Sequence, residues 1–319
     1  MVRREEQQIS LADALVYERV SGNKVLAQIE AHVDWSPIRL RLEKLYRSDG
    51  PGRPAFPVIT MFKVLLLQNL YHLSDPAAEE AISDRLSFRR FLGLNLDQPV
   101  PDHSTIHRFR DRIPGEIEEL LSLVNQQLEA QGLLLKKGTL VDATLVESSA
   151  RRPAFKDGDR SSDQDASWTK QYDQSYYGYR AHLGVDQGSE LIRRADLTTA
   201  RVNEATRFHD MVSGDEAAVY ADKAYYGHER SAWLQHQGIA DGIKRQLPGD
   251  PAADRQAIRT FNHGVEQVRR GIEHVFGTLK HHYHFARCRY RTLSRNRCHF
   301  LLLCICYNLK RQNRLLSAV

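Results

Sequence analysis

Residues 138–149 read GTLVDATLVESS and place one carboxylate inside an apolar run. The valine, threonine and leucine content of this segment is typical of a β-strand. Asp142 lies in its middle, with Leu140 and Val141 before it and Leu145 and Val146 after it. A carboxylate in a buried strand costs several kcal/mol unless its charge is compensated. Asp142 therefore needs a partner, and either a basic side chain or a bound cation would serve.

The overall composition is that of an ordinary soluble protein. The 319 residues are 41% hydrophobic and 27% charged, and the chain is long enough for two domains. The N-terminal MVRREEQQIS has no apolar core, so we expect no secretory signal. The longest apolar run, Phe300 to Tyr307, is far shorter than the ~20 residues of a membrane span. We expect a cytoplasmic protein with no membrane partner.

Positive charge is concentrated near the C-terminus. From Pro251 onward there are about 13 lysines and arginines against about 3 acidic residues, so this part carries roughly +10 and the remainder roughly −5. The cluster RCRYRTLSRNR, residues 287–297, favours contact with a polyanion through Arg289 and Arg291, with a solvated surface as the alternative. The nearby histidines and cysteines lack the paired spacing of a zinc site, and we expect DNA-facing histidines and buried thiols instead.

The N-terminal part, residues 1–132, predicts an all-helical domain. One helix follows Pro54 and Pro57, a second has Asp75 as its N-cap, and a third lies in VPDHSTIHRFRDRI, residues 100–113, capped by Asp102 or Ser104. A fourth ends at Gly132. The third helix should bury Ile106, Phe109 and Ile113 and leave four polar side chains outside: His107, Arg108, Arg110 and Arg112. This pattern suits a helix-turn-helix-like DNA-binding unit, and a small bundle with a charged face is the alternative.

Residues 133–319 predict an α/β domain with basic C-terminal helices. We expect strands in residues 139–147, on both sides of the turn at 186–188, and in AAVYA, residues 217–221. Helices are expected in residues 204–213 and 229–238, in 266–283 and at the C-terminus. Residues 149–176 are polar enough to be a loop, whose Trp168, Lys170, Tyr176 and Tyr177 could become ordered on DNA.

Two further carboxylates join Asp142 as candidates. Asp222 directly follows AAVYA, and the carboxyl end of a strand is where α/β folds place ligands, although a helix cap is equally consistent. Glu273 lies on a helical stripe beside the apolar one, with Glu266, Arg269 and Lys280. Three such carboxylates could hold two Mg²⁺ ions for phosphodiester hydrolysis. Without metal their charges would repel, so we expect a loosely held site; the alternative for Glu273 is a plain Arg–Glu pair one turn apart.

Several motifs in the same order resemble the DDE transposases of bacterial insertion sequences, specifically the group named after insertion sequence five. These motifs are RPAFPVITMFKVLLLQNLYHLSD, FRRFLGL, VPDHSTIHRFR, GTLVDATLVES, YYGYRAHLGVD, YADKAYYG and the R-x3-E-x6-K helix, between about Arg53 and Arg314. The resemblance implies an RNase H-like catalytic core in which Asp142, Asp222 and Glu273 bind metal. It also implies that Arg269 and Lys280 contact DNA near the scissile phosphate. The family motif opens with a tyrosine where this chain has Glu266.

The resemblance implies a transposase that binds terminal inverted repeats, cleaves DNA ends with Mg²⁺, or Mn²⁺ as a substitute, and joins the 3′-OH ends to target DNA. A homodimer would be the working unit, associated with the bacterial nucleoid when bound to DNA. Lys223, beside Asp222, could touch phosphate, and Tyr225 could do so or pack in the core. Two alternatives stay open: a nuclease of the same fold without strand transfer, and a domesticated or inactive DNA-binding protein.

Overall fold

The computed structural model describes residues 9–19, 22–46, 55–151, 161–171, 173–247 and 255–317. The chain forms two compact units. The first comprises residues 1–131 and 308–319, and the second comprises residues 132–307. Helix α12 (Leu293–Leu316) therefore contributes residues to both units, and its last residues group with the N-terminal helices rather than with the expected catalytic part. Arg53 and Pro54, where the motifs and the first expected helix begin, lie outside the described residues.

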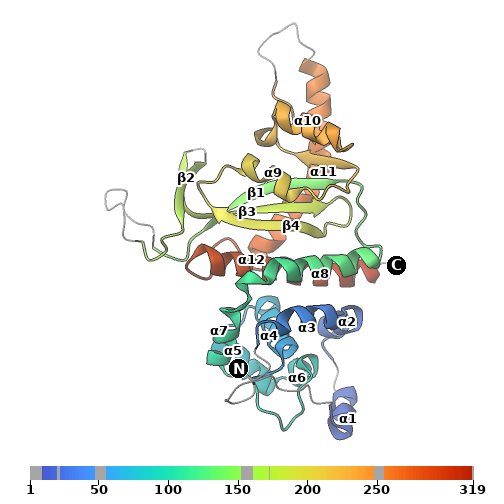
Figure 1. Ribbon diagram of the computed structural model, residues 1–319, viewed down its shortest axis with the longest axis vertical. Coiled ribbons are helices and arrows are strands. Elements are labelled where there is room, and N and C mark those ends of the chain that lie inside the picture. The colour runs from blue at the N-terminus through green and yellow to red at the C-terminus, as the bar shows by residue number, and fades with distance from the viewer. Residues whose placement is uncertain are drawn as a thin grey trace. The chain divides into compact units, whose positions relative to one another are not determined.

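The first unit is helical, as the sequence predicts. Its central helix, α4, buries every residue from Val58 to Asn69, and an apolar surface on all sides is typical of a helix surrounded by others. In the described part of the chain, no helix is long and apolar enough to cross a membrane. The helices of this unit before residue 132 are α1 (Leu11–Arg19), α2 (Lys24–His32), α3 (Trp35–Glu43), α4 (Val58–Tyr71), α5 (Asp75–Asp84), α6 (Leu86–Leu92), α7 (His103–Arg110), η1 (Ile113–Gly115) and α8 (Ile117–Ala130) (Figure 1).

The helix starts partly differ from expectation. Asp102 caps α7 as predicted, because its Oδ1 accepts a hydrogen bond from the Thr105 amide at 2.7 Å. The expected cap of α5 is wrong by one residue, since the Ser74 side chain accepts from the Ala77 amide. The Asp75 carboxylate is instead paired with Arg110, which is therefore buried and not on the outer face of α7.

The second unit is built on a six-stranded mixed sheet. β1 is antiparallel to β3 and parallel to β5, and β5 is parallel to β6. β4 pairs with the other edge of β3, which gives the order β4–β3–β1–β5–β6, and β2 pairs antiparallel with the first residues of β3. Together with the flanking helices, this sheet fits an RNase H-like core. The strands are β1 (Thr139–Glu147), β2 (Ser167–Gln171), β3 (Gln174–Asp186), β4 (Ile192–Thr199), β5 (Ala218–Ala221) and β6 (Ala240–Ile243).

Each face of the sheet is covered by helices. Side chains alternate along β1, so Val141 points to one face and Asp142 to the other. Val141 packs in an apolar cluster that includes Phe208 of α9 (Phe208–Met211) and Leu234 of α10 (His228–His236). Helix α11 (Arg255–His281) packs against β1 and β5, and Figure 1 shows it behind the sheet, with α9 in front. The face that carries Asp142 therefore looks toward α11.

Two expectations for this unit are wrong. Residues 167–171 and 174–176 are not loop but belong to β2 and β3, where the rings of Trp168 and Tyr177 pack in a tilted arrangement with centroids 5.3 Å apart. Paired strands at an exposed edge can carry polar side chains, so the polar composition of this segment did not exclude strands. The sequence also missed β6, a strand of four residues. Residues 152–160 and 172, within the expected loop, lie outside the described residues.

Gly242 allows β5 and β6 to approach each other. A Cβ atom at this position would lie 2.5 Å from Tyr220 Cδ1 and 2.8 Å from the Val219 carbonyl oxygen. We expect Gly242→Ala to lower the free energy of unfolding by about 1–3 kcal/mol, the usual cost of overpacking, in a urea titration. Gly277→Ala, on α11 with open space around the new methyl group, should instead add up to ~1 kcal/mol. Equal effects of the two changes would contradict this role of Gly242.

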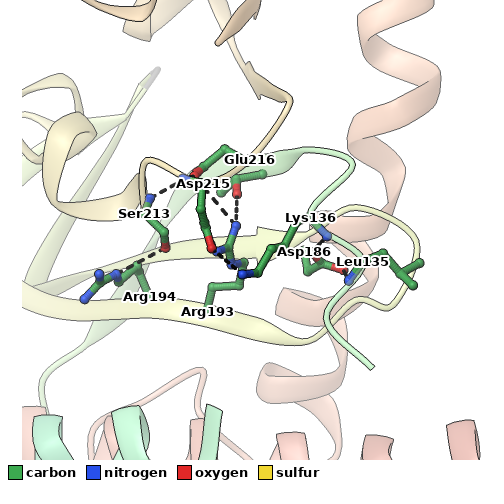
Figure 2. A network of polar contacts seen from close by, with 9 residues as sticks. Leu135, Lys136, Asp186, Arg193, Arg194, Ser213, Asp215 and Glu216 are labelled. Carbon is green, nitrogen blue, oxygen red and sulfur yellow. Dashed lines mark hydrogen bonds and ion pairs between the residues drawn. The ribbon is translucent and has the colours of Figure 1, made fainter. Parts of the chain in front are cut away.

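A network of ion pairs around the buried Arg193 holds the start of β1 in place (Figure 2). Arg193 of β4 pairs with Asp215 and lies 3.7 Å from Glu216, and its Nη1 donates to Thr139 Oγ1 of β1 at 3.2 Å. Lys136 pairs with Asp215 at 2.8 Å. Burial opposes the ionisation of Asp215, but the hydrogen bonds from Lys136 and Arg193 outweigh it and lower its pKa to about 2. The network links β1 to β4 and to the loop before β5, and so fixes the two strands that carry the aspartates.

Candidate active site

Asp142 has a basic partner in this structure. Its Oδ2 accepts a hydrogen bond from Arg269 Nη2 at 2.8 Å, and its Oδ1 accepts one from the Ala143 amide at 2.8 Å. Burial raises the pKa of Asp142 to about 6, although Arg269 and the amide act against that shift. The carboxylate is thus only partly compensated by its protein partners.

Asp222 lies at the carboxyl end of β5, as predicted. It occupies the N-cap position of η3 (Lys223–Tyr225), but its side chain makes no capping hydrogen bond. Its Oδ1 lies 3.8 Å from Arg269 Nη1 and 3.5 Å from Lys244 Nζ, both beyond ordinary hydrogen-bond length. The carboxylate therefore sits between two cations, with its oxygen atoms still available to a ligand.

Arg269 joins the two aspartates. It is 4% exposed, and the described residues offer no hydrogen-bond partner to its buried Nε. One guanidinium thus contacts carboxylates from two strands of the sheet, 80 residues apart in sequence. Arg269 supplies a positive charge between these two carboxylates, so their mutual repulsion, which was expected of the metal-free site, is partly offset. Arg269 was expected to contact DNA, but here its contacts are with Asp142 and Asp222.

Glu273 is not assembled with the aspartates. It lies on α11 one turn after Arg269, where it is exposed and makes no hydrogen bond or ion pair with any described residue. Among the described residues, no group of three His, Cys, Asp or Glu side chains is arranged to hold a metal ion. The structure therefore brings together two of the three predicted carboxylates and places the third on the same helix as their shared arginine.

The predicted cations around the site differ in their environment. Lys280 Nζ donates to Thr144 Oγ1 at 2.6 Å, and Thr144 lies two residues from Asp142 on the same face of β1. Burial lowers the pKa of Lys280. Lys223 is exposed beside Asp222 and has no ion pair within the described residues.

Sequence reasoning missed Lys244 as a site residue. It follows β6, pairs with Glu266 of α11 and faces Asp222. No motif marks it, because a single lysine after a four-residue strand has no distinctive spacing. Glu266, which stands where the related motif has tyrosine, is thus connected to Asp222 through one side chain.

The ring of Tyr225 packs in the core, as one of the two alternatives for this residue predicted, and its hydroxyl is influenced by nearby carboxylates. It packs in the apolar cluster, with its ring centroid 6.1 Å from that of Phe208. Its hydroxyl is buried and has no hydrogen-bond partner within the described residues. Burial and the charges of Asp142 and Glu204 raise the pKa of Tyr225.

Four of the five remaining DNA-binding candidates are exposed, on two basic segments, and the fifth, Arg110, is buried. His107 and Arg108 are exposed on α7, where Arg108 donates to Ser104 Oγ at 2.8 Å, whereas Arg110 is buried. Arg289 and Arg291 are exposed in the segment between α11 and α12. That segment is attached to the end of β1, because the Cys288 amide donates to the Glu147 carbonyl at 2.7 Å.

The mixed sheet with its helices fits an RNase H-like core, and two aspartates meet on one face of that sheet. Comparison with known families agrees with this assignment. The family described as Transposase DDE domain matches residues 134–309, and the one described as Transposase domain (DUF772) matches residues 15–112. The chain therefore belongs to the DDE transposase family, and both matches fit a transposase of the insertion-sequence type.

One solved structure is also similar to this chain. It is described as the cryo-EM structure of the piggyBac transposase synaptic complex with hairpin DNA. Its sequence is 11% identical, the TM-score is 0.45, and the comparison covers 96% of this chain and 76% of that chain.

Proposed function

We propose that the chain is a DNA transposase of the insertion-sequence-five group, which cleaves the ends of its element and joins the 3′-OH ends to target DNA. The observation that carries this proposal is the convergence of Asp142 and Asp222, from two strands, on one cation. A homodimer is the proposed working unit, because two DNA ends must be processed together.

The two aspartates suit a divalent metal ion, Mg²⁺ or Mn²⁺. Their donors are carboxylate oxygens, and Mg²⁺ in proteins usually takes one or two carboxylates and keeps several waters. Asp222 makes no capping hydrogen bond, and the raised pKa of Asp142 reflects a charge that burial leaves under-compensated. Glu273, one turn from Arg269 and without a partner among the described residues, is the proposed third ligand. When bound, the metal would activate the attacking oxygen and stabilise the leaving oxygen of a phosphodiester.

The basic side chains around the aspartates would position the DNA strand. Lys280 is anchored on Thr144, beside Asp142, and Lys223 is exposed beside Asp222. Arg289 and Arg291 lie on the segment attached to the end of β1. Cations on both sides of the site could hold the phosphates of one strand across it.

The helical unit is the proposed reader of the terminal inverted repeats. Arg108, exposed on the well-capped α7, is its candidate base contact. We expect Arg108→Ala to weaken binding of the full chain to end DNA by about 1–3 kcal/mol if this side chain reads a guanine, with little change on random DNA. Competitive binding at fixed salt measures both values. Arg19→Ala, an exposed arginine on α1, is the matched control; an equal loss with the two variants, or on both DNAs, would contradict base reading by Arg108.

A strand-transfer assay tests the proposed reaction. Precut end DNA with a free 3′-OH, Mg²⁺ and a target plasmid should yield joined products with the full chain. Cleavage without joining would instead identify a nuclease of the same fold. Binding to end DNA with neither reaction would identify a DNA-binding protein that has lost its chemistry.

A further inference from the structure

Charges of alternating sign form a continuous row across the site. In order along the row they are Glu266, Lys244, Asp222, Arg269 and Asp142. The first and last belong to α11 and β1, Lys244 follows β6 and Asp222 follows β5, so the row connects four elements of the second unit. Each of the three inner residues contacts two oppositely charged neighbours, and each end residue contacts one.

Lys244 is the member of the row with competing partners. Its Nζ pairs closely with Glu266 and lies 3.5 Å from Asp222 Oδ1. The lysine side chain is 19% exposed, so solvent screens it only partly. An ammonium so close to Asp222 opposes any second cation on that carboxylate, because like charges a few ångströms apart repel strongly at reduced dielectric.

Glu266 limits this competition. Its carboxylate forms the shorter of the two contacts of Lys244, so it draws the ammonium away from Asp222 and offsets its charge. Glu266 makes no hydrogen bond or ion pair with Asp222, so its effect on that carboxylate must pass through Lys244. A residue that acts in this way is a positioning residue rather than a ligand.

We propose that Lys244 competes with the divalent metal for Asp222 and that Glu266 sets the strength of this competition. The inference rests on the proposed metal site at Asp142 and Asp222 and adds two residues that regulate its affinity. It also assigns a task to the glutamate that replaces the tyrosine of the related motif. Loss of Lys244 should favour metal binding, whereas loss of the Glu266 charge should oppose it.

The test is a double-mutant cycle on Mn²⁺ affinity, measured by electron paramagnetic resonance of free Mn²⁺ with the full chain and no DNA. Lys244→Met should tighten Mn²⁺ binding roughly tenfold, which corresponds to about 1.4 kcal/mol. Glu266→Gln should weaken binding several-fold in the presence of Lys244. In the Lys244→Met background, Glu266→Gln should change the affinity little, because its effect passes through the lysine. Thermal melts of all variants establish that each is folded.

Lys223→Met is the matched control, because it removes an exposed positive charge adjacent to Asp222 in sequence. Tightening by Lys223→Met equal to that by Lys244→Met would overturn the proposal in favour of a net-charge effect. Weakening by Glu266→Gln that persists without Lys244 would also overturn it, since Glu266 would then be a ligand itself.

The metal site itself is tested separately by Asp222→Asn. If the wild type binds no Mn²⁺ that Asp222→Asn abolishes, the proposed metal site fails. If Asp222→Asn abolishes binding but the cycle is additive, only the assignment of Lys244 and Glu266 fails.

Discussion

Replacing Asp222 with asparagine is expected to reduce Mg²⁺-dependent cleavage of end DNA by several orders of magnitude. Asparagine preserves the shape of the side chain but removes the charge that would hold the metal, and with it the activation of both reacting oxygens. Folding should survive, because Asp222 makes no capping hydrogen bond and is partly exposed. Single-turnover cleavage with saturating enzyme measures the effect, and Asp142→Asn and Glu273→Gln should give losses of the same kind.

Asp210→Asn is the control for this prediction. Asp210 lies on α9 and forms an exposed pair with Arg207 three residues earlier, so its loss should leave the cleavage rate nearly unchanged. Cleavage by Asp222→Asn at a rate near that of Asp210→Asn would contradict the assignment of Asp222. A rate loss confined to Asp142 and Asp222, with Glu273→Gln fully active, would leave a site of two carboxylates, which is the arrangement that the described residues form.

Arg269→Ala is expected to lower the free energy of unfolding by roughly 3 kcal/mol in metal-free buffer, the low end of the cost of removing one partner from a buried ion pair. The low end applies because Asp142 and Asp222 remain partly accessible to water. Without the guanidinium, the two carboxylates lose the positive charge that both of them contact. Mg²⁺ at about one hundred times its Kd should add roughly 2.7 kcal/mol back, since it binds only the folded chain.

Arg270→Ala is the matched control, because Arg270 is the next residue on α11 and is exposed. Its replacement should change the free energy of unfolding by no more than about 0.5 kcal/mol. Urea titrations of both variants, in chelator and in Mg²⁺, give the four free energies of unfolding needed for the comparison. Equal midpoints for the two variants in chelator would show that Arg269 does not compensate the aspartates.

The sequence predicted the elements that carry the aspartates. The apolar runs around Asp142 and before Asp222 are typical of strands in a buried sheet, and parallel pairing of β1 with β5 places their aspartates near one another. The periodicity of α11 likewise predicted an apolar stripe, of which Val265, Ile272, Val275 and Leu279 are buried and Val268 is partly buried. These features depend on the local pattern of polar and apolar residues, which the sequence displays directly.

The charged partners could not be predicted in the same way. Arg269 and Arg110 are buried because carboxylates far away in sequence, Asp142 and Asp75, meet them in the fold. A periodicity argument counts arginine as polar and assigns it to the surface, whatever partner it has. Strand β6 was not predicted for a related reason. Its sequence ADGI has little strand character, and its pairing with β5 depends on the space that Gly242 leaves for Tyr220.

The arginine between the aspartates has a practical consequence for capturing the protein with DNA. Because an internal positive charge already offsets part of the acidic site, the native chain can keep its fold in chelator, with every proposed ligand intact. Crystals or frozen grids of the unreacted nucleoprotein complex could then be prepared without inactivating substitutions. Adding Mg²⁺ to such crystals would start the reaction at a chosen moment, so that successive time points record substrate and product in one lattice.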